Sequence, residues 1–182
     1  MLISKIENLN VSKESRSALA TEILDNPTEI EGLIKVFQNH KPVSHKAAWI
    51  LEIICRREPI LVFNNLNSIL KEISSIDHDS SRRCIAKIFE ILTRLHESPE
   101  NGYRIQLNAL QVQEISEFCF DTLINKNKAA AKAFAMTSLA NLSQEITWIK
   151  PELLAILKSN YANETAAYKA RARVLISKLE NS

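Results

Sequence analysis

The sequence predicts an all-α protein, built as a right-handed superhelix of about nine or ten helices that repeat in pairs. Apolar residues recur with the spacing of a helix along almost the whole chain, as in Ile85, Ile88, Phe89 and Leu92. No stretch alternates apolar and polar residues for long enough to indicate a strand. The 182 residues include only 2 glycines, so positions that need a positive φ are almost absent.

Internal similarity supports a repeated unit. Residues 129–135 resemble residues 166–172 at an offset of 37 positions. Periods of this length are typical of solenoids, in which stacked helix pairs bury a continuous core. Shorter matches at offsets of 38 and 30 pair Leu51-Glu52-Ile53 with Phe89-Glu90-Ile91 and Glu22-Ile23 with Glu52-Ile53.

Prolines mark the expected helix starts. Pro27, Pro59 and Pro151 each stand where a first helical position is expected, because proline lacks the N–H that would be unbonded there. Asn26 and Glu29 have the spacing of a capping box, with Asn as the capping residue. We therefore expect helices to begin at these three points.

Further boundaries follow from turn residues. Asp79 or Ser80 is expected to cap the helix that contains Arg82 and Arg83. The segment Ser98–Asn108, which holds Pro99, Asn101 and Gly102, predicts an extended loop. The length favours one domain over residues 1–182, with repeats near 12–41, 43–78, 79–126 and 127–162 and a terminal helix at 163–181.

These patterns resemble those of HEAT and armadillo repeats. A basic residue opens a helix, small alanine positions and spaced Leu or Ile follow, and a proline precedes a second amphipathic helix. The resemblance covers nearly the whole chain and implies a curved stack of helix pairs. In such a stack the last helix covers the apolar flank of its neighbour, so we expect Ala167, Ala170, Val174, Leu175 and Leu179 to face the stack and Lys169, Arg173 and Lys178 to face water.

Three segments are also similar to those of a family of short bacterial proteins often labelled adenylosuccinate lyase. The lyase superfamily itself has longer chains and a Gly-Ser-Ser-x-Met-Pro-x-Lys-x-Asn signature, whereas Ser80-Ser81 is followed here by Arg82-Arg83. An enzyme is therefore our third hypothesis. The similar segments are Ala47-Ala48-Trp49-Ile50-Leu51-Glu52, Ile146-Thr147-Trp148-Ile149-Lys150-Pro151-Glu152-Leu153 and Tyr168-Lys169-Ala170-Arg171.

The charge and the cysteines indicate the class of partner and the cellular compartment that we expect. The formal net charge is +2, too small by itself to indicate a nucleic-acid or membrane partner. From Lys126 onward 9 Lys and Arg face 4 Asp and Glu, so the C-terminal third is basic. Cys55, Cys84 and Cys119 lie in apolar helical patterns, which fits buried thiols in a reducing cytoplasm. Residues 1–9 carry Glu7 and lack a long apolar run or a small-residue cleavage site, and no apolar run is long enough for a membrane span, so we expect neither export nor membrane insertion.

The sequence lacks the residues that several kinds of catalytic, nucleotide-binding and metal-binding site require. Two glycines cannot supply a phosphate loop, a dinucleotide fingerprint or a nucleophile elbow. The four histidines are dispersed without a zinc-binding spacing, so we expect no metal and no cofactor. The triplet Asp77-His78-Asp79 fits either an acid–base cluster or a helix cap. Cys119, between Phe118 and Phe120, fits core packing better than catalysis, and no catalytic residue is assigned.

Two tryptophans and a series of cations are the candidate binding residues. Trp49 and Trp148 fit either packing in the fold or a binding role, in which the ring stacks on a base or anchors a partner side chain. Cations recur near the starts of successive first helices, and stacking would align them into a stripe that binds phosphates or an acidic surface. Alternatively, they pair locally with Glu14, Glu52, Glu90 and Glu164. The candidates are Trp49, Arg56, Arg82, Arg83, Lys132, Trp148, Lys169 and Arg171, and the stripe also includes Arg16, Lys46 and Lys128.

The leading hypothesis is a cytoplasmic binding module without chemistry of its own, which engages a protein or peptide on a helical-repeat surface. The alternative is a nucleic-acid-binding module that resembles the HEAT-like alkylpurine DNA glycosylases, a family that binds DNA along a basic face lined with aromatic residues. The basic C-terminal third and the two tryptophans motivate this alternative. The sequence leaves the oligomeric state undecided.

Overall fold

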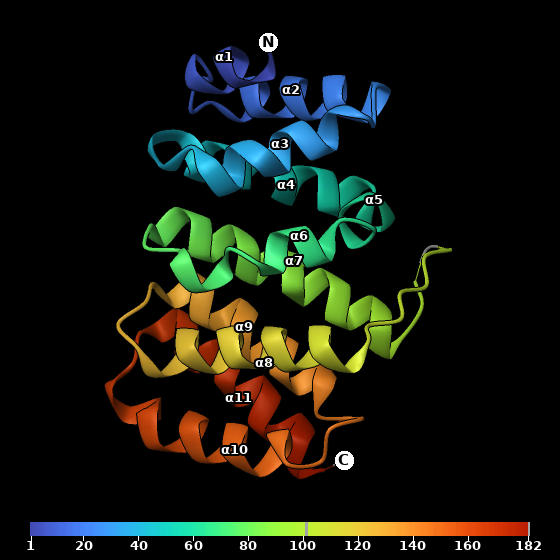
Figure 1. The fold of residues 1–182 in the computed structure, drawn as a ribbon. Helices are drawn as coiled ribbons and strands as arrows, with labels where there is room; N and C mark the ends of the chain where they lie inside the picture. Colours follow the sequence, from blue (N-terminus) through green and yellow to red (C-terminus); the bar gives the residue numbers. More distant parts are fainter. Residues whose placement is uncertain (101, 182) are drawn as a thin grey trace. The chain divides into compact units, whose positions relative to one another are not determined.

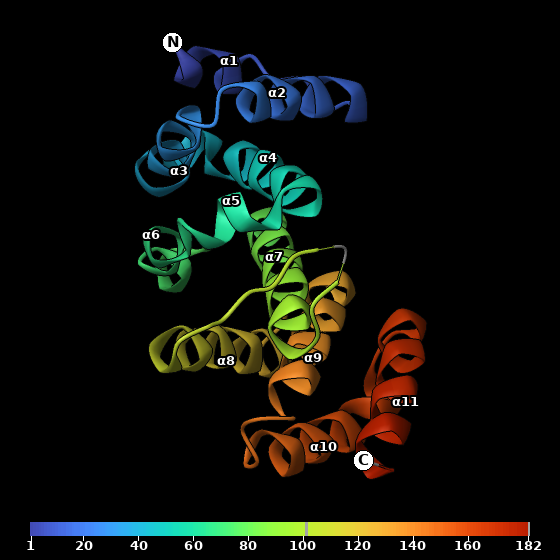
Figure 2. The same cartoon turned by 90° about the vertical axis from the view of Figure 1, so that its right-hand side faces the viewer.

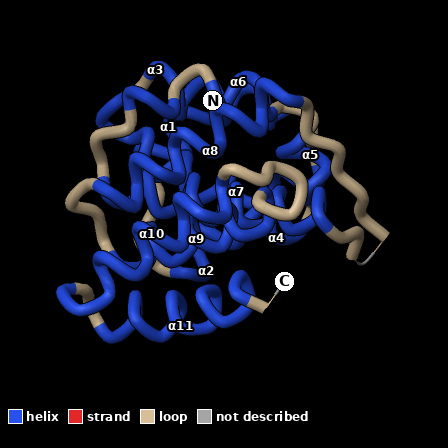
Figure 3. The backbone as a smooth tube through the Cα atoms, turned by 90° about the horizontal axis from the view of Figure 1, so that it is seen from below, coloured by secondary structure: helices blue, strands red, loops and turns tan. Residues whose placement is uncertain are grey.

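The computed structural model describes residues 1–100 and 102–181, which form helices joined by loops (Figure 1). Those residues include no β-strand, as the colouring of Figure 3 shows, and the predicted all-α class is confirmed. The α-helices are α1 (Leu2–Glu7), α2 (Lys13–Asp25), α3 (Glu29–Asn39), α4 (Ser44–Arg57), α5 (Pro59–Phe63), α6 (Leu66–Leu70), α7 (Asp79–Glu97), α8 (Ala109–Ile124), α9 (Ala129–Leu142), α10 (Ile149–Asn160) and α11 (Ala166–Glu180); the short 3-10 helices are η1 (Lys41–Val43), η2 (Ile73–Ser75) and η3 (Tyr161–Asn163).

Residues Met1–Ile88 form one compact unit. Within it α3 contacts α1 and α6, and α2 lies beside α4, so that the helices form two layers (Figure 2). α3 and α4 join these layers through their mutual contact. The interior is aliphatic, since Leu33, Ile50, Leu51 and Ile54 are fully buried, and each such side chain contributes about 1.5–3 kcal/mol through burial.

Residues Phe89–Ser182 form a second compact unit, and α9 is its central helix. α9 contacts α8, α10 and α11, while α10 also contacts α11. The alanine-rich sequence of α9 explains this position, because the small side chains of Ala131 and Ala135 let neighbouring helices approach closely. The rings of Phe89 and Phe118 meet edge to face in the core, with centroids 5.2 Å apart.

The expected helix starts are confirmed in part. Pro59 opens α5 as predicted. α3 begins at Glu29 and α10 at Ile149, so Pro27 lies before its helix and Pro151 lies inside the first turn. The capping box of Asn26 with Glu29 was wrong: residues 27 and 28 form a turn, and the Asn26 side chain accepts from the Thr28 hydroxyl at 2.8 Å.

Other helix starts carry side-chain contacts that the sequence did not predict. At the start of α7, where the sequence predicts a cap by Asp79 or Ser80, the Ser80 amide donates to Nδ1 of His78 at 3.1 Å. The segment before α8 is the predicted loop, in which Asn101 lies outside the described residues, and Gly102 has a φ of 78°. α8 opens with a reciprocal capping box between Asn108 and Gln111.

The terminal helix α11 turns a different face to its neighbours than predicted. Leu175 and Leu179 are buried as expected, but Ala167, Ala170 and Val174 are exposed. Tyr168 and Ala172 are buried in their place, because these two residues share the helix face of Leu175 and Leu179 at spacings of three to four positions. The predicted apolar face was therefore rotated by about a quarter of a turn.

Candidate binding surfaces

The first candidate surface is a hollow of about 430 Å³ on α2, α4 and α7 of the first unit. Its lining contains five cationic side chains and one carboxylate. We call it the arginine hollow. It is lined by Lys13, Arg16, Ser17, Trp49, Glu52, Ile53, Arg56, Arg57 and Arg83.

Glu52 is the centre of the arginine hollow, and only 6% of its surface is exposed. Arg56 donates from Nε at 3.1 Å and from Nη2 at 2.6 Å to the same carboxylate oxygen. Arg83 donates from Nη2 to the other oxygen at 2.8 Å. Burial opposes ionisation of Glu52, but the hydrogen bonds from Arg56, Cys84 and Arg83 outweigh it and lower the pKa of this carboxyl.

Trp49 forms a fixed wall of the same hollow. Its indole N–H donates to the Ser80 hydroxyl at 2.6 Å, and the His45 ring meets it edge to face with centroids 5.1 Å apart. The guanidinium carbon of Arg16 lies 5.2 Å from the centroid of the indole ring, a cation–π contact. Trp49 is therefore held by its neighbours and remains partly exposed.

The second candidate surface is an open hollow of about 640 Å³ on one face of α8 in the second unit. Trp148, which is 55% exposed, stacks on Phe120 with ring centroids 5.7 Å apart. Ile124, which is 64% exposed, lies one helical turn after Phe120. We call it the apolar hollow. It is lined by Ala109, Val112, Gln113, Ser116, Glu117, Phe120, Asp121, Ile124, Ile146 and Trp148.

Comparison with protein families identifies the fold. The model of the HEAT repeat domain matches residues 5–178 of the 182-residue chain. The chain belongs to the HEAT repeat family. No characterised protein and no solved structure matches it. None of the helices in the described part of this HEAT repeat protein combines the length and apolar character needed to cross a membrane.

Three other predicted cations of the HEAT repeat protein donate hydrogen bonds to backbone carbonyls of their own unit. Arg82 donates to the carbonyl of Ile76 at 3.2 Å, and Lys46 donates to the carbonyl of Glu7 at 2.6 Å. In the second unit Lys169 donates to the carbonyl of Ala162 at 3.0 Å. These contacts fix loops and helix ends beside the cations.

Two more cations pair with carboxylates, of which Glu90 is buried and Glu164 is half-buried. Arg171 donates to Glu90 at 3.0 Å and to the Thr137 hydroxyl at 2.8 Å. Lys132 forms an ion pair with Glu164 in which both side chains are largely shielded from water. Three of the four acids proposed as local partners (Glu52, Glu90 and Glu164) therefore do accept from predicted binding residues.

The apolar hollow was missed by the sequence analysis, which singled out only Trp148. A signal was present, because Phe118, Cys119 and Phe120 are consecutive, and three successive apolar residues of a helix cannot all face the same side. Phe118 and Cys119 are buried, and Phe120 points with Ile124 to the outer face of α8. The outward position of Phe120 and Ile124 was therefore the signal in the sequence for an exposed apolar surface on α8.

Burial limits the reactivity of two thiols among the described residues. Burial raises the pKa of the Cys84 thiol, with the Glu52 charge as the next cause, and burial raises that of Cys119 to about 12. His45 and His78 stack with centroids 4.6 Å apart, and burial followed by the His78 charge lowers the pKa of His45. Across the described residues, no three His, Cys, Asp or Glu side chains gather as metal ligands.

Proposed function

We propose that this HEAT repeat protein is a non-catalytic binding module that engages a protein or peptide in the apolar hollow. The observation that carries the proposal is the exposed Trp148, which stacks on Phe120 beside the exposed Ile124. An aromatic side chain in a hollow is the type of residue that dominates binding energy at protein interfaces. We place the protein in the cytoplasm, since its three cysteines are free thiols.

The charge of the hollow favours one kind of partner. Glu117 and Asp121 are exposed at its rim, and its lining residues include neither Lys nor Arg. A segment whose large apolar side chains fill the hollow would therefore bind best with Lys or Arg beside them. The proposed partner is an amphipathic basic segment. The apolar hollow, which lies on one face of α8, suits a helix with apolar anchors on one face.

The nucleic-acid alternative has less support. A phosphate backbone needs a series of cations that can release its counterions. Arg82, Lys132, Lys169 and Arg171 instead bond to carbonyl or carboxylate groups of their own unit. The face of Trp49 also carries the Arg16 guanidinium, so this ring is less suited to stack on a base.

A displayed library of random peptides tests the proposal. Selection on the wild-type protein should enrich peptides with aromatic or large aliphatic anchors beside Lys or Arg. Trp148→Ala should weaken the selected peptides at least about 30-fold, the loss expected for an interface anchor of 2 kcal/mol. Leu110→Ala is the matched control, because it removes an equally exposed apolar side chain of α8 outside the hollow.

Two results would count against the proposal. One is a selected pool that binds the Trp148→Ala protein as well as the wild type while circular dichroism shows both to be folded. The other is enrichment of acidic peptides, since Glu117 and Asp121 should repel them. Either result would move the binding site away from the apolar hollow.

A further inference from the structure

We propose that the arginine hollow binds a phosphate monoester, the group carried by a phosphorylated side chain. This inference concerns a surface of the first unit and is independent of the peptide site proposed in the second. It rests on the number of arginines, on the way Glu52 holds two of them, and on the shape of the hollow.

The net positive charge of the arginine hollow favours the binding of an anion with more than one negative charge. Five cations and one carboxylate line it, which leaves a formal excess of four positive charges. A carboxylate would bring one negative charge, whereas a phosphate monoester brings about 1.5 to 2 at neutral pH. The doubly charged group is therefore the better match to the excess.

The cations are mostly arginines, and this points to phosphate rather than to a general anion. Four of the five are Arg, and only Lys13 is Lys. A guanidinium presents its N–H groups as a planar fork that matches two oxygens of one phosphate, while an ammonium acts as a point charge. Several forks around one hollow can share the three terminal oxygens of a monoester.

Glu52 orients two of these forks before any ligand arrives. It binds Arg56 through one carboxylate oxygen and Arg83 through the other. A guanidinium has five N–H donors, so these bonds leave further donors on both side chains. Holding the guanidiniums in place reduces the entropy lost on binding, which strengthens the binding of an anion.

The remaining arginines are held in a similar way. Arg57 donates from Nη1 to the Thr21 hydroxyl at 2.8 Å and from Nη2 to the hydroxyl of Ser17. Arg16 donates from Nε to the carbonyl of Ser12 at 3.2 Å and lies over Trp49. These bonds orient Arg16 and Arg57 toward their own unit, and the volume of the hollow, about 430 Å³, suits one side chain with its phosphate.

Binding of small aromatic anions tests whether the hollow prefers a phosphate monoester to a singly charged anion. Binding is measured by Trp49 fluorescence in a Trp148→Phe protein. Phenyl phosphate is the monoester probe, and methyl phenyl phosphate and benzoate are the singly charged controls of similar size. We expect phenyl phosphate to bind at least about 10-fold more tightly than either control, because only it offers three terminal oxygens to the arginine forks. Equal binding of the three probes would overturn the proposal.

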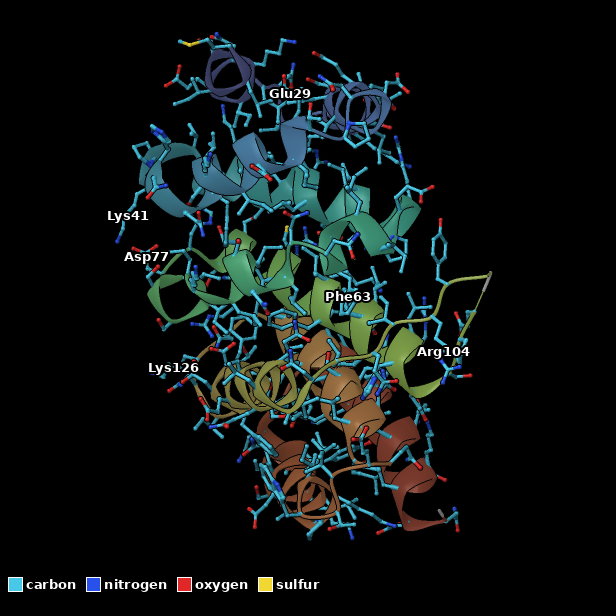
Figure 4. All side chains as sticks on the ribbon, turned by 45° about the vertical axis from the view of Figure 1, so that its right-hand side comes forward. Glu29, Lys41, Phe63, Asp77, Arg104 and Lys126 are labelled. Atoms are coloured by element: carbon cyan, nitrogen blue, oxygen red, sulfur yellow. The ribbon has the colours of Figure 1, made fainter. Side chains whose placement is uncertain are left out.

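Two variants and one control locate the site. Arg83→Ala should abolish the preference for phenyl phosphate, and Arg57→Ala should reduce it with less effect on folding, since Arg57 is exposed. Arg104→Ala removes an exposed arginine from the loop of residues 98–108 (Figure 4) and should leave binding unchanged. The assignment would be contradicted if both variants, Arg57→Ala and Arg83→Ala, were folded and each bound phenyl phosphate as tightly as the wild type.

Further probes distinguish the source of the phosphate. A phosphoserine peptide library and a nucleoside monophosphate both carry the proposed monoester, inorganic phosphate carries the doubly charged group without the ester, and the tightest of the three names the natural class. A single-stranded oligonucleotide carries only diesters along its backbone. If it bound more tightly than every monoester, with an affinity that falls steeply with salt, the monoester proposal would be wrong and the hollow would be part of a nucleic-acid surface.

Discussion

Glu52 of α4 and Arg83 of α7 are 31 positions apart, and a 2.8 Å hydrogen bond joins their side chains. The second unit contains a similar pair, in which Arg171 of α11 donates to Glu90 of α7 at 3.0 Å. Glu90 follows Glu52 by the 38-residue offset of the internal repeat. Both carboxylates are buried, so the two repeat-related glutamates each hold an arginine. The arginines come from different positions, since Arg83 lies 31 residues after Glu52 and Arg171 lies 81 residues after Glu90.

Glu52→Gln should lower the free energy of unfolding by about 2 kcal/mol at neutral pH, because the three charge-assisted hydrogen bonds from Arg56 and Arg83 are weakened while the arginines stay partly hydrated. The folded pKa of Glu52 lies below its ordinary value of 4.5. The contribution is therefore complete above pH 4.5 and is lost as the pH falls through the lower, folded pKa. Urea unfolding of both proteins at several pH values measures this difference, with exposed Glu31→Gln as the control.

Lys132→Met should destabilise the second unit. The Lys132 ammonium pairs with Glu164, and it lies 5.9 Å from the centroid of the Tyr168 ring. Removing one partner of a shielded ion pair leaves the other charge unpaired, at a cost of about 3 kcal/mol. Thermal unfolding should show a clear loss, whereas Lys126→Met, at an exposed position after α8 (Figure 4), should have almost no effect.

The three cysteines should react slowly in the folded protein. All three are buried, and burial raises the pKa of Cys84 and of Cys119, which removes the reactive thiolate. Mass spectrometry after iodoacetamide treatment should find little modification in native buffer and three modified residues in denaturant. Rapid native modification of Cys84 would show that the neighbourhood of Glu52 opens to solvent.

Trp148→Ala should change the free energy of unfolding by about 1 kcal/mol or less, because the side chain is 55% exposed. Leu139→Ala, at a fully buried position of α9, should cost about 2–5 kcal/mol in the same experiment. A large loss for Trp148→Ala would mean that this ring stabilises the fold and is less available to a partner.

The fold could be predicted because it depends on local patterns. Apolar spacing and scarce glycine identified an all-α repeat protein, and Pro59 marked the start of α5. The apolar face of α11 was assigned wrongly, since Ala167 and Ala170 are as compatible with a packed surface as Ala172. The repeat boundaries and the single domain over residues 1–182 remain predictions.

The binding surfaces were harder to predict because they combine distant residues. Arg16, Trp49 and Arg83 come from three helices, and no local pattern relates them. Conversely, Lys132 and Arg171 appeared as candidates for a basic stripe, yet each pairs with a glutamate of its own unit. Sequence spacing placed these cations on helices but could not identify their partners.

The two indole N–H groups test the central claim most directly, because the protein has two tryptophans and each lines a different hollow. Proton–nitrogen correlation spectra, assigned with Trp49→Phe and Trp148→Phe, would follow both signals during titration with a selected basic peptide. We predict a saturable shift of the Trp148 signal while that of Trp49 stays in place. A shift of the Trp49 signal alone, or no shift of either at saturating peptide, would contradict binding in the apolar hollow.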